Sequence, residues 1–351
     1  MNIGLNLLRI LLTLGVVMNH FWWRPDPGNL RGVDVALWQL RTLAVPAFMT
    51  MTFFFTARRF VGGDVAWLKK RYVRLYEPFV FWAVACFLIT MCLSWFDQSY
   101  SASWKDLLWQ LALGHSERLS LTQFWFHTDL LFLTAVFFLA FRLVRSQRAN
   151  VYLALAAIAI GYSVQYSEPA MKAMFGWMSF EAKYPVGRVF SMLPYAGVGI
   201  LLASVKDRLD AAPPGVRLAV AVMGLWLVVW VVYAPVAPRP ASVVGYEGIN
   251  MSLIAWGMMA LFYYIPFDRL PAFCSKAVLF LSKYCMGVYC IHHLLGKVLF
   301  DHVFHFARTE TPYGPITVAP GWFWLLLWAT SYLVCYLVSL IPGSFSKRIV
   351  E

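Results

Sequence analysis

The first hydrophobic segment of this chain, residues 3–23, carries an arginine and a histidine eleven positions apart. Arg9 and His20 are separated by close to three turns of an α-helix, so both point the same way, roughly 16 Å apart along the axis. On the same side fall three more polar residues, Asn2, Asn6 and Thr13. An arginine at membrane depth costs at least ~2.5 kcal/mol unless it is satisfied. We therefore expect this polar stripe of five residues to face a polar interior and to be the working surface of the protein.

The composition predicts an integral membrane protein. The 351 residues are 61% hydrophobic and 13% charged, whereas soluble domains are roughly 45–50% apolar and ~25% charged. Apolar runs long enough to cross a bilayer recur along the chain. We expect an all-α bundle of about ten transmembrane helices that forms a single domain over 1–351 without a soluble domain. The predicted spans are 3–23, 35–57, 79–97, 122–141, 150–166, 189–205, 216–234, 249–266, 277–300 and 321–341.

The distribution of basic residues predicts the orientation of these spans. Loops that follow even-numbered spans carry more Lys and Arg than the others, most densely in the loop at 58–78. The positive-inside rule then places both termini in the cytoplasm. Two explanations of this basic loop remain open. Its residues either set the topology and contact anionic lipid headgroups, or they form an entrance that binds a phosphate-containing ligand. In this orientation all seven histidines fall in the outer half of the membrane or in outer loops.

Polar residues also enter the outer end of the fourth predicted span. His127 and Asp129 follow Trp125 there. An intramembrane carboxylate pairs with a cation or orients a histidine. The alternative is a structural hydrogen-bond cluster at a helix end.

The ninth predicted span has a second polar group in its outer half. Tyr289 and His292 lie one turn apart and share a face, while His293 lies about 100° further round. No HxxxH or HExxH spacing supports zinc, so we expect no metal site. The chain also contains no GxxxxGK, GxGxxG or GxSxG pattern. The six cysteines contain no CxxC pair and are expected to be small hydrophobic residues.

Four segments, in order, resemble the acyltransferase 3 family of bacterial inner-membrane proteins. Asn6-Leu-Leu-Arg9 is followed after ten residues by His20, and Val45-Pro46-Ala-Phe48 leads to the basic stretch Lys70-Arg71-Tyr-Val-Arg74. Phe124-Trp125-Phe126 and Gly287-Val-Tyr289-Cys-Ile-His292 complete the resemblance. Relatives usually have an acid where Asn6 stands and Ser-Gly where Phe55-Thr56 stands.

The resemblance implies transfer of an acyl group, usually acetyl from acetyl-CoA, to a hydroxyl of a carbohydrate or similar cell-envelope acceptor. It implies an essential His20 supported by Arg9, in a multi-pass protein of the bacterial inner membrane. We expect His20 to be the general base and Asp129 to orient it. The expected donor-binding residues are Arg9, Lys70, Arg71 and Arg74, and those of the acceptor or acyl pocket are Trp125, His127, Tyr289 and His292. The expected partners are acyl-CoA, the envelope acceptor and the lipid bilayer, without nucleic acid.

A secondary transporter or exporter of a lipid-linked or polar metabolite is the main alternative. A polar stripe and helices broken near Pro185 and Pro194 are also typical of transporters. Against it stand the lack of an internal repeat and the one-sided histidines. A signalling or scaffold protein would have little use for an intramembrane Arg–His stripe. Consumption of labelled acetyl-CoA by the purified protein would distinguish an enzyme from a transporter.

Overall fold

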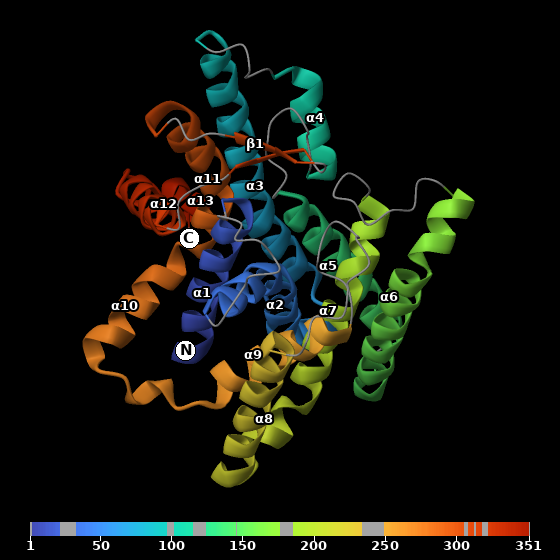
Figure 1. The fold of residues 1–351 in the computed structure, drawn as a ribbon. Helices are drawn as coiled ribbons and strands as arrows, with labels where there is room; N and C mark the ends of the chain where they lie inside the picture. Colours follow the sequence, from blue (N-terminus) through green and yellow to red (C-terminus); the bar gives the residue numbers. More distant parts are fainter. Residues whose placement is uncertain are drawn as a thin grey trace. The chain divides into compact units, whose positions relative to one another are not determined.

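The computed structural model describes residues 2–21, 33–96, 102–114, 124–144, 146–175, 185–233, 249–304, 308–311, 314–317 and 322–350. Helices dominate this part of the chain (Figure 1). The first seven are α1 (Ile3–His20), α2 (Val33–Val61), α3 (Val65–Ser94), α4 (Trp104–Leu113), α5 (Trp125–Val144), α6 (Gln147–Phe175) and α7 (Pro185–Asp210). The others are α8 (Pro214–Tyr233), α9 (Ile249–Tyr264), α10 (Ala272–Lys283), α11 (Cys285–Val298), α12 (Phe323–Ser339) and α13 (Ser344–Val350). Short 3-10 and π-helical turns occupy Phe267–Arg269 and Leu299–Val303.

Each of the predicted apolar segments coincides with a helix, or for the ninth segment with two. In the described residues, four helices are long and apolar enough to cross a membrane: Ile3–His20, Val65–Ser94, Trp125–Val144 and Gly187–Asp210. The pair α10 and α11, bent by 61°, makes a fifth if it forms one span. Three shorter apolar helices are Pro214–Trp230, Ile249–Tyr264 and Phe323–Ser339.

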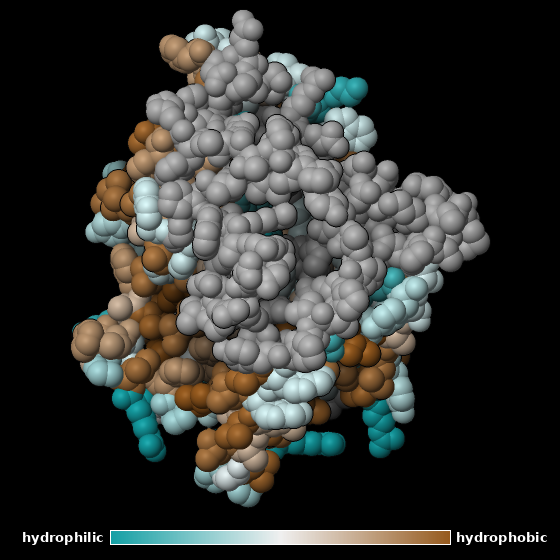
Figure 2. All heavy atoms as spheres, viewed as in Figure 1, coloured by the Kyte–Doolittle hydropathy of each residue, from teal (hydrophilic) through white to brown (hydrophobic). Residues whose placement is uncertain are grey.

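The helix surfaces are those of a membrane protein. Figure 2 shows hydrophobic side chains over much of the visible surface that is not grey. On α8, for example, Leu225, Trp226, Val229 and Trp230 are all exposed. Water-soluble monomers rarely expose apolar patches of such extent. The chain is a multi-helix membrane protein, as the composition predicted.

Helix α3 begins well before the predicted span at 79–97. Asp64 precedes it, and the Asp64 Oδ1 atom accepts the backbone N–H of Ala66 at 2.8 Å. Lys and Arg are good helix formers, so the basic stretch continues the helix instead of forming the predicted loop. Lys70, Arg71 and Arg74 therefore lie on α3, and the loop prediction for this stretch was wrong.

Three further details differ from the sequence-based expectation. The ninth segment is interrupted at Tyr284, whose φ of −89° and ψ of 2° lie in the sparsely populated bridge region. Helix α7 starts at Pro185 and continues through Pro194, so the predicted break there was wrong. An antiparallel hairpin, β1 (Arg308–Thr311) with β2 (Gly314–Thr317), pairs Arg308 with Thr317, and the all-α prediction missed it.

Helix α4 is a short helix of ten residues that follows α3 in the sequence. Its first turn is closed by a capping box. The backbone N–H of Ser103 donates to Asp106 Oδ2 at 2.9 Å, and that of Asp106 donates to Ser103 Oγ at 3.3 Å. Such reciprocal bonds satisfy backbone donors that a helix start leaves open.

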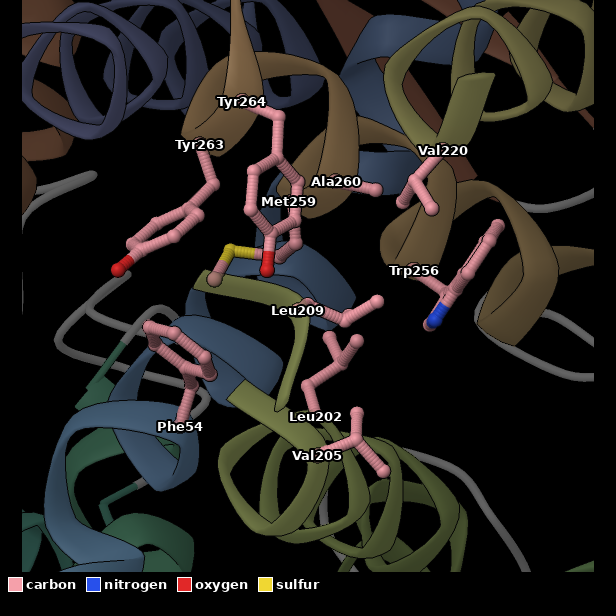
Figure 3. Close-up of a pocket in the computed structure, with 10 residues that line it drawn as sticks. All are labelled: Phe54, Leu202, Val205, Leu209, Val220, Trp256, Met259, Ala260, Tyr263 and Tyr264. Atoms are coloured by element: carbon pink, nitrogen blue, oxygen red, sulfur yellow. The ribbon is translucent and has the colours of Figure 1, made fainter. Parts of the chain in front are cut away.

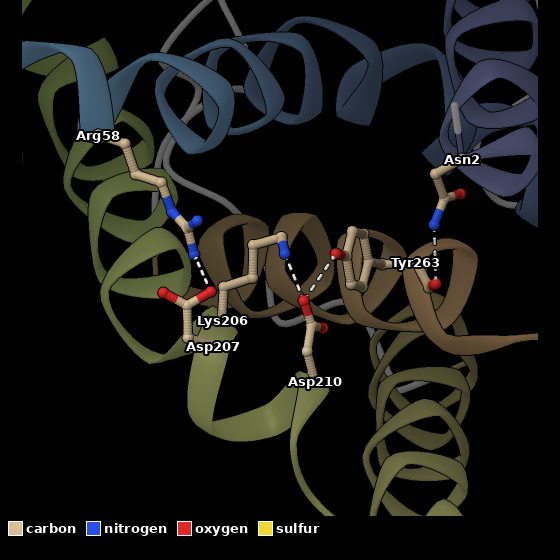
Figure 4. Close-up of polar contacts among 6 residues, drawn as sticks. All are labelled: Asn2, Arg58, Lys206, Asp207, Asp210 and Tyr263. Carbon is tan, nitrogen blue, oxygen red and sulfur yellow. Dashed lines mark hydrogen bonds and ion pairs between the residues drawn. The ribbon is translucent and has the colours of Figure 1, made fainter.

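The chain divides into two compact units, each built from separate stretches of sequence. Unit 1 comprises Met1–Leu8, Leu43–Val73 and Trp125–Pro271. Within it α6 packs along α7 and α8 along α9. Polar contacts join its elements at one end (Figure 4): Arg58 with Asp207, Lys206 with Asp210, Tyr263 Oη with Asp210 Oδ2 at 3.2 Å, and Asn2 Nδ2 with the Tyr263 carbonyl at 3.0 Å.

Unit 2 comprises Arg9–Thr42, Arg74–Phe124 and Ala272–Glu351. Within it α11 packs against α12, and α12 against α13. Helix α13 is also tied to α3, because Trp82 Nε1 donates to the Ile349 carbonyl at 2.9 Å and Arg348 pairs with Glu77 at 3.0 Å. The prediction of a single domain stays a prediction.

Helices α8 and α9 approach closely where two glycines face each other. A Cβ atom added to Gly224 would lie 2.5 Å from the Gly257 carbonyl oxygen, and one added to Gly257 would lie 2.7 Å from the Gly224 oxygen. We expect Gly224→Ala to lower the free energy of unfolding by about 1–3 kcal/mol because the helices must separate. Gly215→Ala is the matched control, since nothing lies within 4 Å of its added Cβ. Equal unfolding midpoints for the two purified variants would contradict this packing.

Candidate functional site

In unit 2, the end of the polar stripe that carries His20 meets α11. The His20 ring lies 5.2 Å from the His292 ring and 5.0 Å from the His293 ring, measured between centroids. His20 and His293 are partly exposed, while His292 is fully buried. These three residues form a histidine cluster built from α1 and α11. Its central feature is that a partly accessible imidazole is flanked by two others.

The middle of the polar stripe meets α12 in the same unit. Thr13 is buried, and its hydroxyl lies 3.2 Å from the Tyr332 hydroxyl and accepts the Trp328 Nε1–H at 3.5 Å. The Tyr332 hydroxyl also lies 3.4 Å from Cys285 Sγ. Arg9 is partly exposed and within electrostatic range of the Cys285 thiol. A polar lining thus accompanies the stripe below the histidine cluster, as expected of a helix face turned away from lipid.

Tyr289 and His292 share the α11 face that the sequence predicted. Both are buried, and their ring centroids are 6.2 Å apart. The ring of His292 donates back to its own helix through Nδ1. The adjacent Gly287 packs too closely for a side chain, because an added Cβ would lie 2.7 Å from Cys335 Sγ on α12. Close packing of α11 on α12 therefore fixes the face that carries Tyr289 and His292.

In unit 1, Asp129 forms a buried ion pair with Arg188 of α7. Arg188 Nη2 donates to Oδ1 at 3.1 Å and Nε to Oδ2 at 3.3 Å, and the residues are 1% and 2% exposed. The guanidinium also lies over the Trp125 ring, 5.7 Å from its centre. Two parallel hydrogen bonds make this a bidentate pair. A cationic partner is one of the two options predicted for this carboxylate, but Arg188 was not predicted as that partner.

The other predicted residues are divided between the two units. His127 is buried in unit 1 with Trp125. Lys70 is exposed, and Arg71 is partly exposed with its guanidinium 5.8 Å from the Trp67 ring centre; both belong to unit 1. Arg74 is exposed and belongs to unit 2. The expectation that Asp129 and His127 face His20 stays a prediction.

Unit 1 also contains an apolar cavity of about 140 Å³. Side chains from α2, α7, α8 and α9 converge on it (Figure 3), among them Phe54, Leu202, Val220 and Met259. Trp256, Tyr263 and Tyr264 also line it. With no carboxylate or imidazole among its lining residues, this cavity offers no general base, in contrast to the histidine cluster.

Two contributors to the site were not assigned from the sequence. His293 was not predicted to take part, because its 100° offset on α11 does not reveal that His20 lies beside it. Tyr332 lies in the last predicted span together with Tyr336, and the sequence does not show which of the two hydroxyls reaches Thr13. Among the described residues, no three His, Cys, Asp or Glu side chains are placed to hold a metal ion.

Comparison with known proteins identifies the chain's family. A protein-family profile described as an acyltransferase domain, acyltransferase 3, matches residues 2–340. No curated protein and no solved structure matches the chain. The match covers nearly all of both units and includes the polar stripe, the histidine cluster and the Asp129–Arg188 pair. It favours an enzyme over the transporter alternative. The chain belongs to the acyltransferase 3 family and is a membrane acyltransferase that transfers groups other than amino-acyl groups.

Proposed function

We propose that this protein transfers an acyl group, acetyl in the first instance, from acyl-CoA on the cytoplasmic side to a hydroxyl of a cell-envelope carbohydrate or related acceptor near the outer face. The observation that carries the proposal is the histidine cluster at the end of the polar stripe. It offers a base at a partly exposed position, flanked by a polar lining that continues along α1 toward Thr13 and Arg9. No nucleic acid or metal takes part.

The proposed reaction needs one side chain that acts first as a base and then as an acid. His20 removes the proton from the acceptor hydroxyl as that oxygen attacks the thioester carbonyl carbon. The carbon–sulfur bond then breaks, and the CoA thiolate leaves with the electron pair. The His20 imidazolium returns the proton to the thiolate, so that the products are an O-acyl ester and free CoA. General base catalysis of this kind is typically worth 10²–10⁴-fold in rate.

The basic residues are assigned to the donor. Arg9 lies on the stripe below His20 and would orient the pantetheine arm, while Lys70, Arg71 and Arg74 of α3 would bind the phosphates of CoA. Guanidinium groups suit phosphates because they bond them in a bidentate manner. Trp125, His127 and Tyr289 are assigned to the acceptor or acyl pocket, and Asp129 to orientation of the catalytic groups.

The proposed location is the bacterial inner membrane, with about ten spans and both termini in the cytoplasm. This orientation follows from the excess of Lys and Arg in loops after even-numbered spans. The donor would enter from the basic side, where CoA is available, and the acceptor from the opposite side.

Mass spectrometry of the host's envelope glycans tests the proposal. Glycans from cells that contain the protein should carry acyl esters, seen as added acetyl masses that mild alkali removes. Cells that lack the gene should lose them, and restoring the gene should return them. Identical ester content in the presence and absence of the protein would contradict the proposed function.

Arg9 gives a second test, directed at the donor. We expect Arg9→Ala to raise the KM for acetyl-CoA by about 10- to 100-fold, because hydrogen bonds to charged groups are worth ~1.5–3 kcal/mol. Arg9→Lys should recover only part of this loss, since an ammonium does not reproduce a bidentate guanidinium. Arg208→Ala, at an exposed position of α7, is the control. An unchanged donor KM in Arg9→Ala would make Arg9 structural.

A further inference from the structure

The imidazole of His292 is held in one tautomer by its own helix. Its Nδ1 atom lies 2.9 Å from the carbonyl oxygen of Tyr289 and 3.1 Å from that of Val288. A carbonyl oxygen only accepts hydrogen bonds, so Nδ1 must carry a hydrogen and donate it. In the neutral ring, the other nitrogen, Nε2, then bears a lone pair and acts as an acceptor.

This acceptor nitrogen is buried without a donor. The Nε2 atom of His292 has no hydrogen-bond partner among the residues that the structure describes, and the side chain is 0% exposed. A buried polar atom left unsatisfied is costly, and native proteins rarely keep one without a reason. A ligand that brings a hydroxyl or amide hydrogen would satisfy this nitrogen.

The position of the His292 ring indicates which substrate would supply this hydrogen. The His292 ring lies 5.2 Å from the His20 ring, with the two planes inclined by 45°. The ring of His293 lies 5.0 Å from His20 on an edge-to-face contact. The ring that carries this unpaired nitrogen is therefore next to the base of the proposed reaction, where the acceptor hydroxyl has to sit.

We propose that His292 is an acceptor-binding residue whose Nε2 atom accepts a hydrogen bond from a hydroxyl neighbouring the one that His20 deprotonates. This inference rests on the proposed acyl transfer and adds a statement about which acceptor groups the site favours. A nitrogen fixed as a hydrogen-bond acceptor favours a group that donates hydrogen. It disfavours a carboxylate or phosphate oxygen at the same place, because neither has a hydrogen to donate.

Two variants separate the anchoring role of Nδ1 from the binding role of Nε2. In His292→Asn, the amide nitrogen takes the place of Nδ1 and can still donate to the helix carbonyls, but nothing replaces Nε2. In His292→Gln, the longer side chain places its amide near the position of Nε2, where the amide oxygen can accept. If His292 has only a structural role, Asn should replace it better than Gln. If His292 binds the acceptor, Gln should replace it better than Asn.

The KM values for the two substrates are then measured separately in membrane vesicles. The probes are acetyl-CoA and an envelope carbohydrate fraction from cells that lack the protein. We expect His292→Asn to raise the carbohydrate KM about 10-fold, as for loss of a good hydrogen bond, with the acetyl-CoA KM unchanged. His292→Gln should recover much of the loss. A shift in the acetyl-CoA KM instead, equal behaviour of Asn and Gln, or wild-type KM values in His292→Asn would overturn the proposal.

A spectroscopic measurement tests the tautomer without turnover. In protein labelled with ¹⁵N-histidine, the signals missing from His292→Asn identify the His292 nitrogens. They should show a protonated Nδ1 and an unprotonated Nε2, and a protonated Nε2 in the substrate-free protein would overturn the inference. If no variant, including the wild type, transfers acetyl groups, the proposed function fails, and the tautomer result still stands by itself.

Discussion

Replacing His20 by alanine should reduce acyl transfer by about 10²–10⁴-fold, the range typical of a lost general base, while leaving a folded protein in the membrane. The reason is that the acceptor hydroxyl would have to attack the thioester with its proton still attached. Transfer is measured with labelled acetyl-CoA in vesicles, and folding is checked by the unfolding midpoint of the purified protein.

The matched control for this variant is Leu14→Ala. Leu14 lies on the same helix but points about 120° away from the polar stripe and is partly exposed. The Leu14→Ala variant removes side-chain volume from α1 on a side away from the histidine cluster, so the rate of acyl transfer should stay within a few-fold of wild type. Near-normal turnover in His20→Ala would rule out His20 as the base.

The second large effect concerns stability. Arg188→Met should lower the free energy of unfolding by about 3–5 kcal/mol, because it leaves the Asp129 carboxylate buried without its cation. The double variant Asp129→Leu/Arg188→Met should regain most of that loss, since no charge then remains buried. Denaturant or thermal unfolding in detergent gives the comparison.

An exposed ion pair of the same type serves as the control. Arg58 and Asp207 pair with side chains that are 51% and 76% exposed, so Arg58→Met should cost no more than ~1 kcal/mol. Equal losses for the two arginine variants would contradict the buried-pair account. The rate of acyl transfer by the stable double variant distinguishes two roles of Asp129. The rate should fall if the carboxylate orients catalytic groups, and it should persist if the carboxylate only holds Arg188.

The sequence was sufficient to locate helices because hydrophobic length and period are local properties. Every long apolar run coincides with a helix, or in one case with two helices. Helix ends were less predictable where polar residues continue a helix. At Lys70 and Arg71 the chain is basic but remains helical, since long charged side chains favour helix nearly as well as apolar ones.

Contacts between helices were predicted only where polarity demanded a partner. The stripe on α1 required a polar neighbour, and the structure supplies Tyr332, Trp328 and the α11 histidines. Which helix supplies the partner depends on tertiary packing, and periodicity does not encode it. The same limit applies to Asp129, for which a cation was foreseen but Arg188, 59 positions away, was not. No proline in the helix signals the bend at Tyr284. The hairpin at 308–317 has no Asn-Gly turn, but Pro312 and Gly314 are of residue types that favour turns, which the helix prediction did not take into account.

The most direct test of the proposed acyl transfer follows a labelled acetyl group in the presence of the purified protein. The wild-type protein is placed in vesicles with labelled acetyl-CoA and an envelope carbohydrate fraction from cells that lack it. We expect the label to move to the carbohydrate as an alkali-labile ester, with one free CoA thiol formed per ester, and we expect no such ester in His20→Ala vesicles. Label that stays on acetyl-CoA in the wild-type vesicles, or equal esters with His20→Ala, would contradict the proposed acyl transfer.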